Sequence, residues 1–150
     1  MQRSISDQKS LTLFIYIIVF IIYSSLSSIY PSLPPLFSLL FIMFSRALDR
    51  KEILYTVVVS FLLIIFEANF GYFLFSSIIY FYLVQRFFIP KLIQNFSCPL
   101  CIKISYVLLA YIGYFLFLTL ISSIFLLPVP TINYYIIYYI IIEFFLVAIL

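Results

Sequence analysis

Long uninterrupted apolar runs constrain this chain more than any other feature of its sequence. Three of them read LTLFIYIIVFIIY (11–23), ILYTVVVSFLLIIF (53–66) and YYIIYYIIIEFFLVAIL (134–150). Hydrophobic residues fill 67% of the 150 positions, and a water-soluble domain of this length leaves too much of its surface wet to bury them. The sequence therefore predicts that lipid is the solvent for most of the chain.

Six of the apolar runs are long enough to cross a bilayer, whose hydrocarbon core of ~30 Å needs roughly 20 helical residues. The runs are continuous rather than alternating, which favours helices over the strands of a barrel. We therefore predict an all-α, polytopic integral membrane protein with a single transmembrane domain over residues 1–150. Its six transmembrane helices are expected at about 11–30, 31–48, 53–69, 72–89, 104–127 and 129–150.

All eight basic residues fall on one side of this six-helix arrangement. The loops on the other side, YPSLPP (30–35), EANFG (67–71) and LPVPT (127–131), carry none. Since Lys and Arg are enriched in cytoplasmic loops, we expect both termini to be cytoplasmic and EANFG to face outward. A five-helix alternative that omits the second run would move part of the basic set outside. The basic residues are Arg3, Lys9, Arg46, Arg50, Lys51, Arg86, Lys91 and Lys103.

The EANFG turn places a carboxylate between two apolar runs, in a chain where only 9% of residues are charged. Gly71 suits a tight turn because glycine adopts left-handed backbone conformations at little cost. One reading is that Glu67, or Asn69 in its place, accepts hydrogen bonds from the first amides of the following helix. The other reading is that Glu67 contacts an Arg or Lys of a partner protein. The sequence leaves both readings open.

Glu143 lies inside the last apolar run, past its middle. At ~1.5 Å per residue it is expected roughly 10 Å from the inner surface of the bilayer. An acidic group at that depth costs on the order of a few kcal/mol unless it is paired or protonated, so Glu143 is a candidate functional residue. Its expected internal partners are Arg86 and Lys103, whose long side chains can reach in from the cytoplasmic edge. A contact with a partner helix and a role in proton or ion handling are the alternatives.

Cys98 and Cys101 form the motif CPLC in a predicted cytoplasmic loop. The spacing is that of half a zinc site, but the chain has no histidine and no other cysteine to complete one. A redox CxxC normally lies at a helix N-terminus of a thioredoxin-type fold. We expect two reduced thiols, with a metal site shared between molecules as the alternative.

The motifs of most enzyme classes are missing from the sequence. It contains no glycine-rich phosphate loop, HExxH or GxSxG motif, and it has no histidine. The basic loops are short and are explained by topology, so nucleic-acid binding is not expected. The sequence predicts a protein that is not an enzyme, has no catalytic residues and needs no cofactor.

A pattern between residue 30 and about residue 95 resembles a known family. Its second helix starts with a proline and a hydrophobic run, as in YPSLPPLFSLLFIMF (30–44), and its fourth helix ends in basic residues, as in YFYLVQRFFIPKL (80–92). Its third helix ends in an acidic residue, followed by Gly four positions on, a hydrophobic residue seven on and Gly eight on. Glu67, Gly71 and Leu74 match, but Glu67 replaces the usual Asp and Phe75 replaces the second Gly. The family is the rod shape-determining protein MreD.

This resemblance implies a scaffold in the bacterial cytoplasmic (inner) membrane. Members of the family join an MreC-like protein, MreB filaments, a RodA-type polymerase and a class B penicillin-binding transpeptidase, so these proteins and membrane lipids are the expected partners. The fold of the family also resembles the substrate-binding subunits of energy-coupling-factor transporters. A small-molecule transporter subunit and an accessory subunit of another envelope complex are therefore the alternative functions.

Overall fold

The computed structural model describes the backbone of residues 2–150, and the side chains of residue 8 and of residues 10–150. The predicted cytoplasmic positions of the Arg3 and Lys9 side chains therefore lie outside the described residues. Within residues 2–150 the chain is helical and contains no strand, which confirms the all-α prediction.

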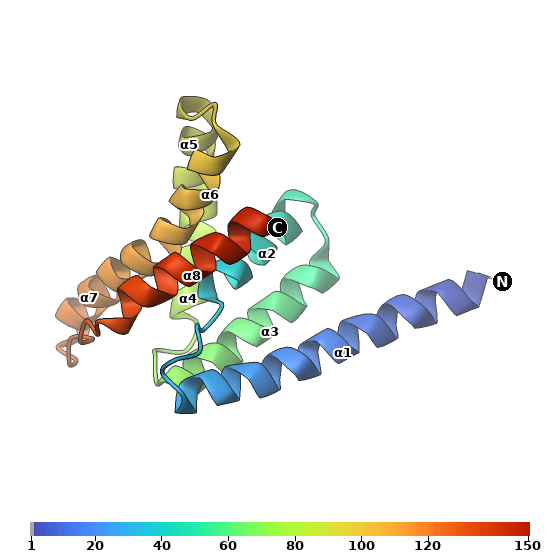
Figure 1. Ribbon diagram of the computed structural model, residues 1–150, viewed down its shortest axis with the longest axis horizontal. Coiled ribbons are helices and arrows are strands. Elements are labelled where there is room, and N and C mark those ends of the chain that lie inside the picture. The colour runs from blue at the N-terminus through green and yellow to red at the C-terminus, as the bar shows by residue number, and fades with distance from the viewer. Residues whose placement is uncertain (1) are drawn as a thin grey trace.

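The helical elements form six continuous segments, because two π-helical turns join neighbouring α-helices without a break. Figure 1 shows these segments along the chain. The first three are α1 (Gln2–Ile29), α2 (Phe37–Asp49) and α3 (Ile53–Phe70). The fourth comprises α4 (Ser76–Leu83), η1 (Val84–Phe88) and α5 (Ile89–Asn95). The last two are α6 (Pro99–Leu108), η2 (Leu109–Gly113) and α7 (Tyr114–Phe125), followed by α8 (Tyr135–Ile149).

Among the described residues, three segments are both long and apolar enough to cross a membrane: Ser10–Ile29, Ile53–Phe70 and Pro99–Phe125. The apolar helix Tyr135–Ile149 is shorter. The helix α2 starts at Phe37 rather than near residue 31 and has only 13 residues. At ~1.5 Å per residue it is about 20 Å long, less than the ~30 Å hydrocarbon core. The prolines of segment 30–36 explain the late start, because proline disfavours helix in the residue before it.

The helix α2 lies at the centre of the molecule, where it contacts α3, α4, α6, η2 and α8. Its aromatic side chains form the core with rings from the neighbouring helices. The Phe37 ring stacks on Phe66 with centroids 4.8 Å apart, and Phe41 lies 4.6 Å from Phe81. These four side chains are at most 3% exposed. Aromatic packing around α2 therefore fixes the positions of the helices that surround it.

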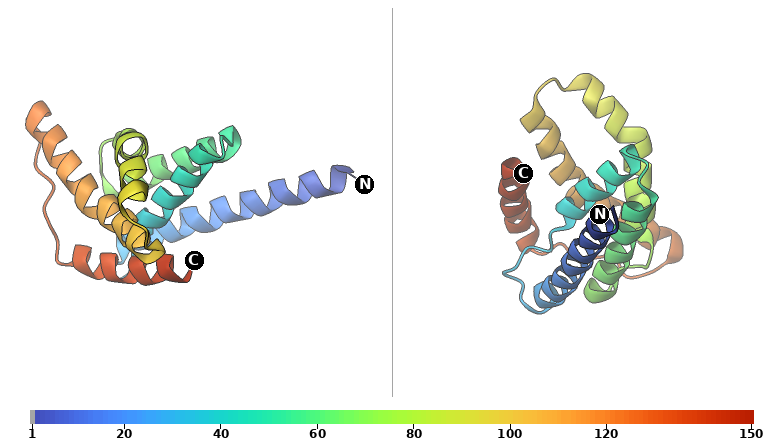
Figure 2. Two further views of the ribbon diagram at one scale, coloured as in Figure 1. Left: turned by 90° about the horizontal axis from the view of Figure 1, so that it is seen from above. Right: turned by 90° about the vertical axis from the view of Figure 1, so that its right-hand side faces the viewer.

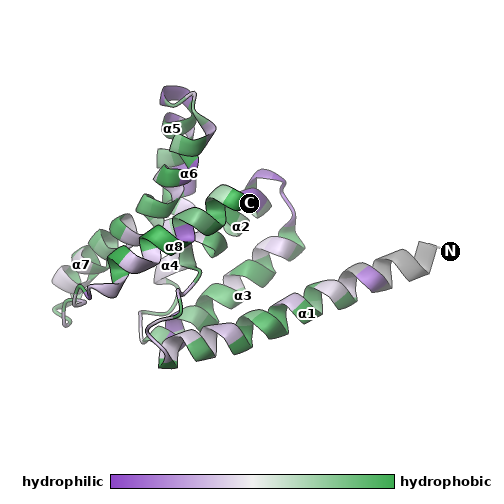
Figure 3. Ribbon diagram, viewed as in Figure 1, coloured by the Kyte–Doolittle hydropathy of each residue, from purple (hydrophilic) through white to green (hydrophobic). Residues whose placement is uncertain are grey.

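The outer faces of the helices are strongly apolar. Figure 3 shows hydrophobic residues along α1, α3, α7 and α8, and hydrophilic residues at the turn between α2 and α3 and near the tip between α5 and α6. The N-terminal half of α1 extends beyond the other helices in Figures 1 and 2. Long helices with exposed apolar faces are typical of a membrane protein. On α1 alone the exposed side chains include Leu11, Phe14, Ile15, Ile18, Val19 and Ile22.

Candidate functional site

Glu67, on the last turn of α3, is completely buried. One carboxylate oxygen accepts a hydrogen bond from the Phe75 amide at 2.6 Å. The other accepts from the Ser77 amide at 2.6 Å, and from the hydroxyls of Ser77 at 2.7 Å and Ser76 at 3.0 Å. The first amides of a helix have no partner within it and carry partial positive charge, so Glu67 caps α4. No surface of its carboxylate remains for an Arg or Lys of a partner protein.

The turn between α3 and α4 depends on two residues with left-handed backbone conformation. Gly71 has a φ of 71° and ends α3, and the Tyr72 amide donates to the Glu67 carbonyl at 2.9 Å. Phe75 has a φ of 68° and precedes α4. Asn69 does not cap α4, because its amide donates instead to the Ser24 hydroxyl at 3.0 Å and so joins α3 to α1. The turn thus brings the first backbone amides of α4 within hydrogen-bond distance of the Glu67 carboxylate.

Glu143, on α8, caps a second helix from a distance in the sequence. Its oxygens accept from the amides of Phe37 at 3.0 Å and Ser38 at 2.8 Å, at the start of α2. The hydroxyls of Ser38 and Tyr111 also donate to it, and the side chain is only 1% exposed. Glu143 is therefore satisfied by internal hydrogen bonds, and its partners are not the two basic residues expected from the sequence, Arg86 and Lys103. The Lys103 ammonium group donates instead to the Ala148 carbonyl at 3.3 Å. Ala148 lies in the last turn of α8, where the backbone carbonyls have no partner within the helix.

Two tyrosines at the junction of η2 and α7 connect the two capping sites. Tyr111 donates to Glu143, and the Tyr114 hydroxyl lies 2.8 Å from the Ser76 hydroxyl, which itself donates to Glu67. The Phe37 ring lies between them, with its centroid 4.8 Å from that of Tyr114 and 6.1 Å from that of Tyr111. The capped starts of α2 and α4 are therefore held in one hydrogen-bonded and aromatic unit.

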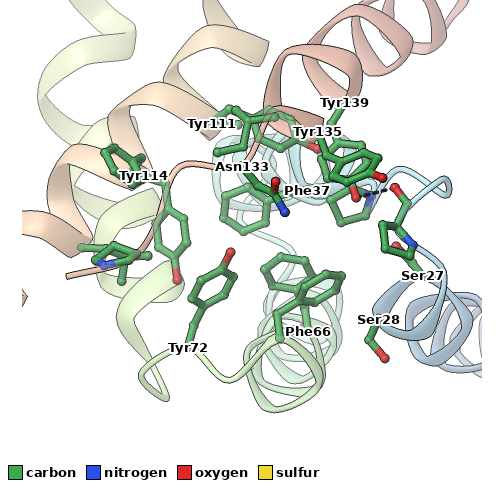
Figure 4. A pocket seen from close by; sticks show the side chains of 18 of the residues that line it. Ser27, Ser28, Phe37, Phe66, Tyr72, Tyr111, Tyr114, Asn133, Tyr135 and Tyr139 are labelled. Atoms are coloured by element: carbon green, nitrogen blue, oxygen red, sulfur yellow. Dashed lines mark hydrogen bonds between the residues drawn. The ribbon is translucent and has the colours of Figure 1, made fainter. Parts of the chain in front are cut away.

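A cavity of about 300 Å³ lies beside this unit. Figure 4 shows its wall of aromatic rings, which come from α2, α3, the α3–α4 turn, η2, α7 and α8. The proline-rich segments 30–36 and 126–134 contribute Pro31, Pro35, Pro130 and Asn133 to the lining. A concave, mostly aromatic space with a few polar groups is the usual form of a small-molecule site.

Cys98 is exposed and precedes α6, and Cys101 is half-buried on its first turn. Hydrogen bonding to the Cys101 thiol and amide lowers the pKa of the Cys98 thiol below its usual value. Among the described residues no cluster of three or more His, Cys, Asp or Glu side chains could hold a metal ion. A metal at this motif would need ligands from another molecule.

Several of the residues that hydrogen-bond to Glu67 and Glu143, or connect the two sites, were not predicted as functional from the sequence. Tyr111 and Tyr114 lie within the predicted helix 104–127, and Ser38, Ser76 and Ser77 lie within the predicted helices 31–48 and 72–89. A signal was available for the serines, since hydroxyl residues are favoured where a helix begins after a turn. No such signal marks the tyrosines, because their partners lie on other helices.

Comparisons with protein-family models, with curated proteins and with solved structures found no match.

Proposed function

We propose that this chain is a divergent, non-catalytic membrane scaffold of the MreD type. In this role it lies in the bacterial cytoplasmic membrane and links an MreC-like protein, the RodA-type polymerase and the class B penicillin-binding transpeptidase to cytoplasmic MreB. Its helices serve as an organising surface, and its buried carboxylates serve to position those helices.

The geometry of the α3–α4 turn is the observation that carries this proposal. The family pattern consists of an acidic residue, a Gly four positions later and a second Gly eight positions later. Here the acidic side chain at 67 caps α4, and residues 71 and 75 both have the positive φ that glycine adopts at little cost. Phe75 thus departs from the pattern in its side chain while keeping the backbone conformation that a glycine would favour. The cap made by residue 67 and the positive φ at residues 71 and 75 give a physical reason for the spacing of the family pattern.

The proposal includes six membrane crossings with both termini in the cytoplasm. The basic residues Arg46, Arg50 and Lys51 lie at or after the end of α2, and Arg86, Lys91 and Lys103 surround the α5–α6 tip. The short helix α2 fits a crossing because the non-helical segment 30–36 continues it, and irregular backbone is tolerated at membrane depth when it is buried in protein. Tyrosine hydroxyls satisfy part of this segment: Tyr23 donates to the Pro34 carbonyl and Tyr139 to the Pro31 carbonyl, each at 2.7 Å.

The test is affinity purification of the tagged chain from native membranes in mild detergent, followed by mass spectrometry. We expect the MreC-like protein and the wall-synthesis pair to co-purify, and depletion of the chain to convert rods to round cells. A matched purification of an unrelated multi-pass protein at the same expression level is the control. Recovery of an ATP-hydrolysing transport module in place of these partners, with unchanged cell shape, would assign the chain to a transporter instead.

A further inference from the structure

The cavity described above combines aromatic walls with hydrogen-bonding groups that the protein itself leaves unused. It lies between the starts of α2, α7 and α8 and the end of α3, under segments 30–36 and 126–134. Figure 4 shows the rings of Phe37 and Phe66 and the side chains of Tyr72 and Asn133 facing the same space. This feature has no part in the scaffold role proposed above, and the inference drawn from it does not depend on that role.

The polar groups of the cavity divide into two sets. The hydroxyls of Tyr111 and Tyr139 donate to Glu143 and to the Pro31 carbonyl, so they are already used. The hydroxyl of the half-buried Tyr72 and the amide of the exposed Asn133, in contrast, have no hydrogen-bond partner in the part of the chain that the structure describes, and the same holds for the hydroxyls of Thr131 and Tyr135. The Tyr72 hydroxyl can donate a hydrogen bond and accept one. The Asn133 amide both donates and accepts.

The cavity is also uncharged. No Asp, Glu, Lys or Arg lies among the described side chains that line it. A phosphate or carboxylate bound there would lose its hydration without gaining a counter-ion, which costs far more than burying a neutral polar group. A lipid acyl chain would leave the Tyr72 hydroxyl and the Asn133 amide unpaired. The lining therefore selects a neutral molecule that has both a flat apolar face and hydrogen-bonding edges.

We propose that this cavity binds a small, uncharged, planar nitrogen heterocycle. Its ring faces pack against the partly exposed aromatic rings of the wall, such as Phe70 and Tyr135. Its edge exchanges hydrogen bonds with the Asn133 amide and accepts one from the Tyr72 hydroxyl. The volume of about 300 Å³ is at the lower end of the range for small-molecule sites and suits a one- or two-ring compound.

The first experiment measures binding to the full chain in detergent by equilibrium dialysis with radiolabelled compounds. Adenine and nicotinamide are the neutral probes, and nicotinate is the anionic match of nicotinamide. We expect saturable binding of at least one neutral probe and at least about tenfold weaker binding of nicotinate, because its carboxylate has no counter-ion in the cavity. Failure of both neutral probes to bind, or equal binding of nicotinamide and nicotinate, would overturn the proposal.

The second experiment assigns the binding to the cavity. Asn133→Leu and Tyr72→Phe each remove hydrogen-bonding atoms while keeping a side chain of similar size. We expect roughly tenfold weaker binding for Asn133→Leu and about threefold to tenfold weaker binding for Tyr72→Phe. Their matched controls are Asn95→Leu, at the exposed end of α5, and Tyr138→Phe, whose hydroxyl contacts the Ser32 carbonyl outside the cavity.

Far-UV circular dichroism and gel filtration show whether each variant keeps the wild-type fold. If Asn133→Leu does not fold, Tyr72→Phe decides the outcome, since it deletes a single oxygen atom. Unchanged affinity in the folded cavity variants, or an equal loss in the control variants, would reject the assignment. Neither result bears on cell shape or on the partners of the chain, so the scaffold proposal stands or falls on its own experiment.

Discussion

At the scale of single residues, the two buried carboxylates show how an apolar chain accommodates a charge-bearing group. Neither forms an ion pair with any basic side chain that the structure describes, and both accept hydrogen bonds from helix N-termini and from hydroxyls. The arrangement satisfies two needs together, because the first amides of a helix also lack partners. Removing either carboxylate would leave these amides unpaired where water is scarce.

Replacing Glu67 tests this account. Glu67→Ala leaves the amides of Phe75 and Ser77 without acceptors, so we expect the free energy of unfolding to fall by at least about 2 kcal/mol. Glu52→Ala is the matched control, because Glu52 is exposed, makes no side-chain cap to α3 and should change stability by less than about 0.5 kcal/mol. Thermal unfolding in detergent, followed by far-UV circular dichroism, measures both. Equal stability of the two variants would remove the capping role.

Phe75 offers a second test at this scale. Its φ of 68° costs a residue with a β-carbon about 1–2 kcal/mol, and its side chain is 54% exposed, so it gives little packing in return. We therefore expect Phe75→Gly to raise the midpoint of thermal unfolding. Phe75→Val should lower it, because a β-branched residue is least suited to this conformation. The opposite order of the two midpoints would show that the side chain, not the backbone, determines stability here.

At the scale of helices, the π-helical turn η2 gives Tyr80 a carbonyl to bind. The Tyr80 hydroxyl donates to the Leu109 carbonyl at 2.7 Å, at the first residue of η2. Gly113 makes this approach possible, since a β-carbon there would lie 1.9 Å from the Tyr80 oxygen. The contact fixes α4 against the fifth helical segment. The close approach of Tyr80 explains why Gly113, one of the two glycines in the chain, has no side chain.

Gly113→Ala should therefore displace Tyr80 and break its hydrogen bond, which lowers the free energy of unfolding by about 1–3 kcal/mol. Tyr80→Phe removes the clashing oxygen, so the double variant should recover part of this loss. A double-mutant cycle on thermal or denaturant unfolding measures the coupling. Strict additivity of the two single changes would contradict the contact.

Glu143 connects elements that are far apart in the sequence. In Glu143→Leu the amides of Phe37 and Ser38 lose their acceptor, so we expect them to exchange hydrogen at least about tenfold faster, as loss of about 1.4 kcal/mol of protection implies. The amides capped by Glu67 provide an internal control and should keep their protection. Mass spectrometry of peptides that cover the starts of α2 and α4 compares the two directly. Faster exchange at both starts would mean general loosening of the fold.

At the scale of the whole molecule, the position of the basic residues and the proposed topology can be tested with a native residue. Cys98 is exposed and lies at the α5–α6 tip, which should face the cytoplasm. A membrane-impermeant maleimide should label it in inside-out vesicles and not in intact cells. Labelling in intact cells would overturn the orientation, and with it the expected contact with MreB.

The same residue gives a pH dependence. Because the pKa of Cys98 is lowered, its reactive thiolate is present at lower pH than in an ordinary cysteine, and the labelling rate should reach half its maximum at a correspondingly lower pH. Cys101→Ala removes the hydrogen bonds of the Cys101 thiol, so the midpoint should move up towards the usual value. An unchanged midpoint would show that Cys101 does not control the reactivity of Cys98.

Separation along the chain explains which parts of the site could be predicted. The partners of Glu67 lie 8–10 residues away, so the possibility of a local cap was visible in the sequence. The amides that Glu143 caps lie 105 and 106 residues away, and their position depends on how α8 packs across α2. The basic residues expected to pair with Glu143 were closer to it in the chain, but in the fold the start of α2 is the nearer partner.

The helical class and the succession of helical segments could be read from the amino-acid sequence, because they follow from the continuous apolar runs and from the prolines and loops between them. Which helix start each carboxylate caps, where α2 begins and which aromatic rings enclose the cavity depend on how the helices pack together. This difference arises because the hydrophobic effect depends on the apolar area that each residue removes from water and requires no particular partner. Hydrogen bonds and ring packing instead need particular atoms within a few ångströms, which only the assembled helices bring together.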